Sequence, residues 1–424
     1  MGIAFEGLFQ PAALFFLVNL ISWWINMVRF FTIAVGSLAL AGVAGASAFS
    51  GWASKFRPEV ALAIDSSSPN ALIVVNESAW KAKDKSHFKK VAKSNAMRVL
   101  QREPLSYRAL RQLGVYYVMT GAPSKGRDLV AMSTLLTRRD AIGQMWLADD
   151  SARRGRIDES MQAFDIVIRT QPDAREVAFG AMNGALADPR FRSAFVKLAA
   201  DNPPWLSSFV AFSIGTSTRP ADLADVLRKL RPISKSILPE KEAGSLLSRL
   251  VSEAPIENAR DLYLSLPGAR RAVLTSITFS NAREAFRYSP FGWEIFDNAG
   301  VQAFGSGKDA NVMIEALVLP GYRGTAARKL LFLPKGAHRW TGTTTLADMS
   351  QGATAAMTLS CYRAPGRWSR AADIQLRNGV NRFDFEVPDD CRAQLLSLDL
   401  LGADNQNDSA MTLQSMQLQV APAG

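Results

Sequence analysis

The chain has 424 residues, a length that predicts two or three domains rather than one. Hydrophobic residues make up 48% and charged residues 21%, which excludes bulk disorder; with only two histidines and two cysteines, a histidine-based metal site, a Ser-His-Asp triad or a Cys-His nucleophile is not expected. The formal net charge of +11 lies almost entirely beyond residue 54, so this region is expected either to attract acidic partners or to present a basic, soluble surface.

The segment Phe30–Phe49 is uncharged and long enough to cross a bilayer as a helix. Arg29 precedes it, and Ala46-Ser47-Ala48 has the A-x-A pattern that signal peptidase cleaves. Residues 1–54 are therefore expected to form a signal anchor or a cleaved signal peptide, with the membrane as a partner through Phe30–Phe49.

A second apolar stretch, Ala12–Val28, comes before this segment. Its polar residues Asn19, Ser22 and Asn26 fall at helical spacing, which is typical of an amphipathic helix at a membrane interface. A true start at Met27 would instead give a well-formed signal segment, and the sequence leaves both alternatives open.

Residues 55–204 are expected to form helical repeats, because a period of 34 residues runs from about Pro69 to Pro204. The spacing relates Pro104, Arg138 and Pro172, then Gly121 and Gly155, then Leu113 and Leu147, and also the small residues Gly114 and Ala148. This order of a large residue, a small residue, a turn glycine and a closing proline resembles the tetratricopeptide repeat. The resemblance implies stacked helical hairpins in a solenoid that binds a partner protein; the alternative is an irregular helical array.

Residues 205–288 continue the helical pattern without the same register. Pro220–Leu230, Pro239–Glu253 and Ile256–Leu266 each read as a helix with a proline near its start, which is a favourable first-turn position. This stretch is expected to be either degenerate repeats or a cap on the last apolar face.

Lysines cluster at the start of the helical region. They are Lys81, Lys83, Lys85, Lys89, Lys90 and Lys93. This basic patch is expected to meet an anionic leaflet or an acidic polymer, with a solvated helix face as the plain alternative. Nucleic acid is not expected as a partner, because no nucleic-acid motif accompanies the lysines.

The composition changes near Ser289, where short strand-like runs separated by turn residues begin. The predicted strands are Gly292–Phe296, Asn311–Leu319, Arg328–Leu333, His338–Thr345, Ala355–Tyr362, Arg382–Val387, Gln394–Leu400 and Met411–Val420. Strands at this spacing without intervening helices predict an all-β jelly-roll sandwich over residues 289–424. The overall prediction is a multidomain chain: a membrane or signal helix, an all-α solenoid and this sandwich.

A set of residues in the β region resembles the C-terminal sandwich of bacterial envelope and exopolysaccharide proteins, which is similar in architecture to carbohydrate-binding modules. The set is Leu331–Gly336, Trp340, Cys361, Phe385–Pro388 and Cys391–Gln394. The resemblance implies glycan binding. Aromatic rings and arginines suit sugars and acidic groups, so the expected glycan-binding residues are Tyr322, Arg323, Trp340, Arg367 and Trp368.

The compartment follows from the two cysteines and the A-x-A sequence. Cys361 and Cys391 lie at the ends of strand-like runs and are expected to form a disulfide, which would persist in an oxidising compartment; two buried free thiols are the alternative. The basic residues flanking the apolar segment slightly favour a cytoplasmic C-terminus. Weighing these, we expect an inner-membrane protein with its bulk in the periplasm, or a secreted or cell-surface protein after cleavage.

The function expected from the sequence is a non-catalytic envelope scaffold in exopolysaccharide biosynthesis or export, with no catalytic residue, metal or cofactor. It would bind an envelope protein through the helices and a glycan, an acidic polysaccharide among the candidates, through the sandwich. One alternative is a polysaccharide lyase or glycosidase using Glu294 with Asp297, or Glu315. Another is a purely structural assembly factor. The acidic loop Asp404–Asp408 is expected to be a solvated turn rather than a calcium site.

Overall fold

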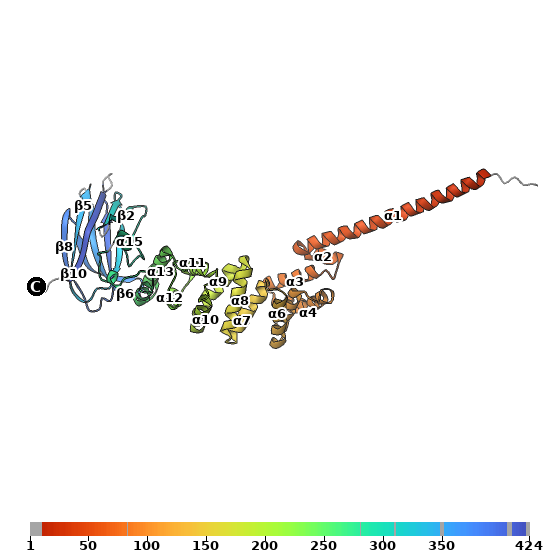
Figure 1. Cartoon of the computed structure of the whole chain (residues 1–424), viewed down its shortest axis with the longest axis horizontal. Helices are drawn as coiled ribbons and strands as arrows, with labels where there is room; N and C mark the ends of the chain where they lie inside the picture. The colour runs from red at the N-terminus through yellow and green to blue at the C-terminus, as the bar shows by residue number, and fades with distance from the viewer. Residues whose placement is uncertain are drawn as a thin grey trace, which may run out of the picture. The chain divides into compact units, whose positions relative to one another are not determined.

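The structure is a computed structural model that describes residues 11–82, 84–279, 281–308, 311–347, 352–404 and 409–420. The chain divides into two compact units, Met1–Leu147 and Ala148–Gly424. The first unit is helical, and the second begins with helices and ends in a two-sheet antiparallel β-sandwich, coloured from teal to blue in Figure 1. A helical region followed by a β-sandwich is the predicted order of structure.

The helices of the first unit are α1 (Pro11–Phe56), α2 (Pro58–Ile64), α3 (Pro69–Lys81), α4 (Lys85–Arg102), α5 (Tyr107–Met119), α6 (Pro123–Leu136) and the first part of α7 (Ala141–Arg153). Those that follow are α8 (Ile157–Thr170), η1 (Pro172–Ala174), α9 (Arg175–Ala185), α10 (Pro189–Ala199), α11 (Leu206–Thr216), α12 (Pro220–Lys229), α13 (Glu240–Glu253), α14 (Ile256–Tyr263), η2 (Arg271–Leu274) and α15 (Ala282–Ala285).

Helix α1 is continuous from Pro11 to Phe56. Among the described residues, Met27–Phe56 is the one helical stretch whose length and apolar composition would allow it to cross a membrane, with a mean hydropathy of 1.8. Its apolar side chains project from the helix with few contacts, as at Phe30 and Leu38, which are 72% and 77% exposed. The predicted polar stripe at Asn19, Ser22 and Asn26 lies outside the side chains that the structure describes.

The C-terminal end of α1 is packed into the first unit. Ala53 on α1, Ala61 on α2 and Ala71 on α3 form a fully buried cluster. Alanines allow the three helix backbones to approach closely, so the end of α1 belongs to the packed part of this unit.

Helices α5 and α6 pack closely against each other. A Cβ added at Gly114 would lie 2.7 Å from the carbonyl oxygen of Gly126 and 2.7 Å from a methyl of Val130, so only glycine fits. Gly121 joins the two helices with φ at +90°, a left-handed conformation that favours glycine. Gly155, between α7 and α8, has φ at +75°. The glycines predicted to lie in turns between helices do so. The tetratricopeptide arrangement stays a prediction.

The sandwich contains β1 (Glu294–Ile295), β2 (Val301–Lys308), β3 (Asn311–Val318), β4 (Arg323–Leu331), β5 (Gly336–Ala347), β6 (Thr354–Ala364), β7 (Arg367–Gln375), β8 (Gly379–Val387), β9 (Gln394–Leu401) and β10 (Ser409–Val420). One sheet, here called sheet A, has the order β1-β4-β9-β6-β7, and the other, sheet B, has the order β2-β3-β10-β5-β8. All pairs are antiparallel.

Two strands of the sandwich were not predicted, β2 and β7. Each lies at the edge of its sheet. Strand β2 contains Gly305 and Gly307, and β7 carries four charged or polar residues in its first seven positions. Glycines in β2 and polar residues in β7 interrupt the hydrophobic alternation, so the sequence does not reveal these two strands.

The sandwich is fastened to the segment that precedes it by a buried lysine. Lys329 on β4 is 0% exposed, and its Nζ donates to the carbonyl oxygens of Val273, at 3.1 Å, and Phe291. Nζ also lies 4.9 Å from the ring centroid of Phe279. Burial lowers the pKa of Lys329 to about 7, although Glu284 acts in the opposite direction.

Candidate functional site

A groove of about 320 Å³ opens on one face of sheet A. Four adjacent strands line it with mostly polar side chains: Arg323, Gly324 and Thr325 from β4, Asp399, Leu400 and Leu401 from β9, Thr354, Ala356 and Thr358 from β6, and Arg370, Asp373 and Gln375 from β7. A volume of this size lies at the lower end of the range for small-molecule sites.

Strand alternation explains why polar groups reach this face. On β9 the leucines Leu396, Leu398 and Leu400 point into the sandwich and are buried. The intervening residues, Ser397 and Asp399 among them, therefore point outward. Because Asp399 pairs with Thr325 on one side and Ala356 on the other, neighbouring strands place their outward residues beside it.

The carboxylate of Asp399 is held in position at the centre of the sheet. Thr325 Oγ1 donates a hydrogen bond of 2.7 Å to Asp399 Oδ1. Across the groove, Arg370 Nη1 lies 2.9 Å from Asp373 Oδ2 in an ion pair. These contacts orient one carboxylate on β9 and one on β7 while leaving further lone pairs available to a ligand.

Thr358 supplies a polar group that has no partner in the protein. It lies on β6 between its register partners Ser397 and Asp373, and it is only 6% exposed. Within the described residues its Oγ1 is buried without a hydrogen bond. A buried hydroxyl without a partner costs about 1–3 kcal/mol, so a ligand or water that bonds to it would recover that energy.

The groove therefore offers donors and acceptors side by side. Arg323 is exposed, and no ion pair or side-chain hydrogen bond engages its guanidinium within the part of the chain described here. Gln375 adds an amide and the threonines add hydroxyls. Ala356 has a small side chain that takes up little of the groove. No aromatic ring lines the groove among the described residues. Such a surface suits a ligand that carries many groups able to donate and accept hydrogen bonds.

Of the predicted glycan-binding residues, Arg323 lines the groove. Its neighbour Tyr322 is 51% exposed, but its ring lies against Gly300, where an added Cβ would be 2.1 Å from the ring. Tyr322 is therefore adjacent in sequence to the groove residue Arg323 but does not line the groove itself.

The assignment of Trp340 to a sugar platform is corrected by the structure. Trp340 on β5 is 0% exposed and pairs with Phe383 and Leu418 inside sheet B. Its ring occupies the space that a side chain at Gly342 would need, with a gap of 2.7 Å to an added Cβ. Because the indole fills the core, it is not available to stack on a ligand.

Arg367 and Trp368 lie at the other end of sheet A. Arg323 is linked through Leu401 to Thr354 on β6, whereas Arg367 pairs with Ala364. Thr354 and Ala364 are ten residues apart on β6, or roughly 33 Å. Arg367 is exposed, and Trp368 is half-buried with its ring 5.5 Å from that of Tyr362. The predicted pairs therefore do not form one site.

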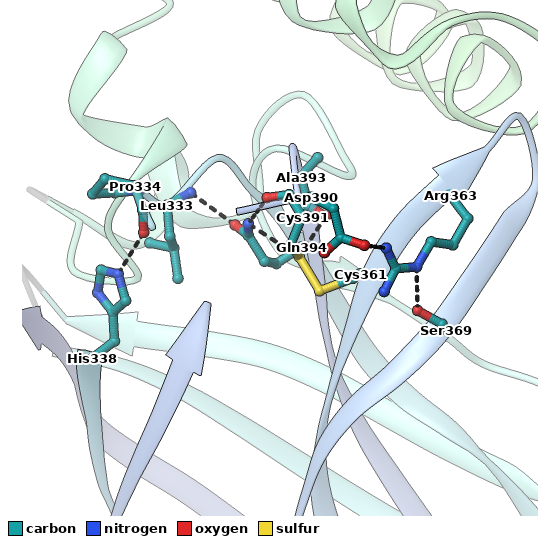
Figure 2. Close-up of a disulfide and its surroundings, with 10 residues drawn as sticks. All are labelled: Leu333, Pro334, His338, Cys361, Arg363, Ser369, Asp390, Cys391, Ala393 and Gln394. Atoms are coloured by element: carbon teal, nitrogen blue, oxygen red, sulfur yellow. Dashed lines mark hydrogen bonds and ion pairs between the residues drawn. A yellow bond between two sulfur atoms is a disulfide. The ribbon is translucent and has the colours of Figure 1, made fainter. Parts of the chain in front are cut away.

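The predicted disulfide is present at this second end of sheet A. Cys361 on β6 is bonded to Cys391, with 5.2 Å between the Cα atoms, as Figure 2 shows. Gln394 is fully buried beside it; its Nε2 donates to the Cys391 carbonyl at 2.8 Å, and its Oε1 accepts from Leu333 N at 2.7 Å. Arg363 pairs with Asp390 next to the bridge. Together these contacts fix the turn that leads into β9.

The described lysines of the basic patch lie on the first half of α4. Lys85, Lys89, Lys90 and Lys93 are exposed there. No ion pair involves these four lysines within the described residues. Lys83 and the side chain of Lys81 fall outside the part of the chain that is described.

Glu294 and Glu315, two of the acids considered for catalysis, lie on different sheets. Glu294 on β1 forms an ion pair with Arg328 and accepts a hydrogen bond from Ser248. Glu315 lies on β3, in the other sheet, and is exposed. No cluster of three or more histidine, cysteine or acidic residues that would hold a metal occurs among the described residues. Residues 405–408 of the acidic loop lie outside them.

Sequence reasoning missed most of the groove, namely Thr325, Thr358, Asp373, Gln375 and Asp399. One signal was present: Asp399 stands in a leucine-rich run at an outward position of the alternation. The residues of β7 carried no such signal because that strand was itself unpredicted.

No family model matches the chain, and no curated protein matches it either. Solved structures do. The CBM22-1 xylan-binding domain of Xyn10C from Paenibacillus barcinonensis is 15% identical, with a TM-score of 0.25, and the match covers 36% of this chain and 96% of that domain. A CBM4 structure is 13% identical, with a TM-score of 0.22, and covers 30% and 86%. TmCBM61, solved with β-1,4-galactotriose, is 13% identical, with a TM-score of 0.23, and covers 34% and 96%.

Proposed function

We propose that the groove on sheet A binds a glycan. The observation that carries this proposal is the unpartnered, buried Oγ1 of Thr358 in a groove otherwise lined by oriented carboxylates, arginines and an amide. A sugar hydroxyl both donates and accepts, so one pyranose ring can bond to an acceptor such as Asp399 and a donor such as Arg323 at once. The free guanidinium of Arg323 favours a glycan that also carries acidic groups.

The wider proposal is a non-catalytic scaffold in the bacterial envelope, with a role in exopolysaccharide biosynthesis or export. Helix α1 would anchor the chain in the inner membrane, and the oxidised pair Cys361 and Cys391 supports a periplasmic position for the sandwich. Secretion or display at the cell surface after cleavage is the alternative. The helices would hold a partner protein.

The test is glycan binding by the full chain in detergent, on an array that contains neutral glycans and the acidic polymers alginate and polygalacturonate. We expect retention of acidic glycans. The variants Thr358→Val and Asp399→Asn remove groove groups without changing side-chain size much, and each is expected to weaken binding at least tenfold. Glu315→Gln on the other sheet is the matched control for the loss of one strand carboxylate.

Two outcomes would replace this proposal. Absence of binding to every glycan, with a folded chain, would favour a purely structural assembly factor. Shortening of a polymer during incubation would favour a lyase or glycosidase, for which Asp373 and Asp399 would be the first carboxylates to replace because both line the groove.

A further inference from the structure

A second pocket lies in the first unit, between α3, α4, α5 and α7. It has a volume of about 60 Å³. Its walls are Trp80, Phe88, Val115, Ile142 and Trp146, and its floor is made by Asn76, Glu77, Arg111 and Gln112. The rings of Trp80 and Phe88 meet edge to face with 5.3 Å between centroids. Trp80 and Ile142 remain 45% and 52% exposed, so the walls are open to a ligand.

The charged floor of this pocket is satisfied within the protein. Arg111 is 5% exposed and pairs with Asp140 and, at 2.8 Å, with Glu77. Arg108 pairs with Glu77 at 2.7 Å. Two arginines and two carboxylates thus cancel, and the floor offers no unbalanced charge to a ligand.

The amide groups of the floor are satisfied in the same way. Asn76 Nδ2 donates to Gln112 Oε1 at 2.8 Å, and Asn95 donates to Asn76 Oδ1 at 2.9 Å. Gln112 Nε2 donates to the Ile73 carbonyl at 3.0 Å. Since both the charges and the amides are engaged, the occupant that fits between the aromatic walls is apolar.

The volume limits the size of that occupant. A space of about 60 Å³ on this measure holds roughly four to six water-sized groups. A leucine, isoleucine or methionine side chain has four heavy atoms and fits, whereas an indole does not. The pocket therefore matches one aliphatic side chain.

The basic patch adjoins this pocket on the same helix. Phe88 lines the pocket from α4, and Lys85, Lys89 and Lys93 follow one stripe about 60–140° around the helix from it. Like charges four residues apart near a helix N-terminus oppose each other and the helix dipole. No ion pair involves them within the described residues, so an acidic partner would relieve this repulsion.

We propose that an acidic segment of a partner protein docks here, with one aliphatic side chain in the pocket and its carboxylates on Lys85, Lys89 and Lys93. This inference rests on the part of the proposed function in which the helices hold a protein. An anionic lipid surface would engage the lysines alone and leave the pocket empty. The combination of a size-limited pocket and an adjoining basic stripe favours the peptide.

The probe is a fluorescein-labelled twelve-residue peptide of glutamate and serine with one central leucine, titrated against the full chain in detergent. We expect saturable binding. Replacing the central leucine by alanine removes about three methyl or methylene groups and is expected to weaken binding about fifty-fold. Peptides with a central tryptophan or lysine are also expected to bind more weakly.

Two protein variants complete the test. Ile142→Asp places a charge on the exposed wall, and the triple variant Lys85→Glu, Lys89→Glu, Lys93→Glu reverses the stripe; each is expected to weaken binding at least tenfold. Lys125→Glu, Lys197→Glu, Lys241→Glu is the matched triple control at other exposed lysines and is expected to change binding less than twofold. Thermal melting confirms that each variant is folded.

The inference is overturned if the leucine peptide does not bind, or if the central residue makes no difference. Vesicles containing phosphatidylserine that bind in a stripe-dependent manner, while the peptide does not, would identify the patch as a lipid surface. If the unmodified chain binds glycan but does not bind the leucine peptide, this inference is refuted and the proposal for the sandwich is unaffected.

Discussion

Thr325 on β4 and Asp399 on β9 are joined by a 2.7 Å hydrogen bond across 74 residues of sequence. The bond points the carboxylate of Asp399 across the outer face of sheet A, where four strands contribute to the groove. The two residues are register partners, so the contact follows from strand pairing and not from loop geometry. The groove is thus built on paired strands, with a β-bulge in β4 between Thr325 and Ala327 beside it.

Replacing Asp399 by asparagine is expected to reduce glycan affinity with little effect on stability. A hydrogen bond to a charged group contributes about 1.5–3 kcal/mol, which corresponds to roughly a tenfold to hundredfold loss of affinity. Isothermal titration against the best glycan of the array measures the loss. An unchanged dissociation constant would remove Asp399 from the site.

Removal of the disulfide is expected to destabilise the sandwich but to leave glycan binding in the groove nearly unchanged. The bridge spans 30 residues, and closing such a loop stabilises the folded state by about 3–4 kcal/mol. The double variant Cys361→Ser, Cys391→Ser should therefore melt at a lower temperature than the oxidised chain. Its glycan affinity should stay within twofold, since neither cysteine lines the groove; a large loss would show that the bridge and the groove are coupled.

The stability of the second unit is expected to rise with pH between about 7 and 10. Burial lowers the pKa of Lys329 from 10.5 to about 7, so in this window the folded chain holds a neutral amine while the unfolded chain is protonated. The unfolded state then binds more protons, and the free energy of unfolding increases with pH, by an amount on the order of 4 kcal/mol over the window. Below pH 7 both states are protonated and this contribution is flat.

Urea unfolding at several pH values measures the slope, and Lys329→Met is the control that removes it. The variant is expected to lose stability because the carbonyls of Val273 and Phe291 lose their donor. Identical slopes in the two proteins would mean that Lys329 keeps its charge when buried.

Helix α1 is expected to remain attached to the mature chain. It runs unbroken through Ala46-Ser47-Ala48 to Phe56, and Ala53 is fully buried against Ala61 and Ala71. A peptidase needs an extended backbone, which this helix does not offer. Intact-mass measurement of the protein extracted from membranes should include residues 30–48. A mass that corresponds to a chain starting at Phe49 would instead indicate a cleaved signal peptide and would favour the secreted alternative.

The sequence predicted the helical region, the apolar N-terminal helix, the disulfide and the central strands, because each depends on local pattern or on residue type. Strong apolar alternation identified β9, whereas the polar edge strand β7 gave no pattern. The prediction that Trp340 binds sugar was wrong for a related reason. An indole occurs both in cores and in sugar sites, and only the folded sandwich, in which β5 lies between β8 and β10, shows that this ring is buried.

The groove itself was not predictable beyond Arg323. Its members come from positions 323 to 401 and meet only when the order β4-β9-β6-β7 is known. Threonine and alanine on the outer face of β6 resemble ordinary strand residues in the sequence. A one-residue shift in register would have turned Thr358 into the core and erased the site.

The fastening of β4 by Lys329 has a mechanical consequence. The side-chain nitrogen of Lys329 holds the carbonyls of Val273 and Phe291 against β4, and Ser248 on α13 donates a hydrogen bond to Glu294 on β1. Force applied to a strand of sheet A would therefore be transmitted through these hydrogen bonds to the segments that precede the sandwich.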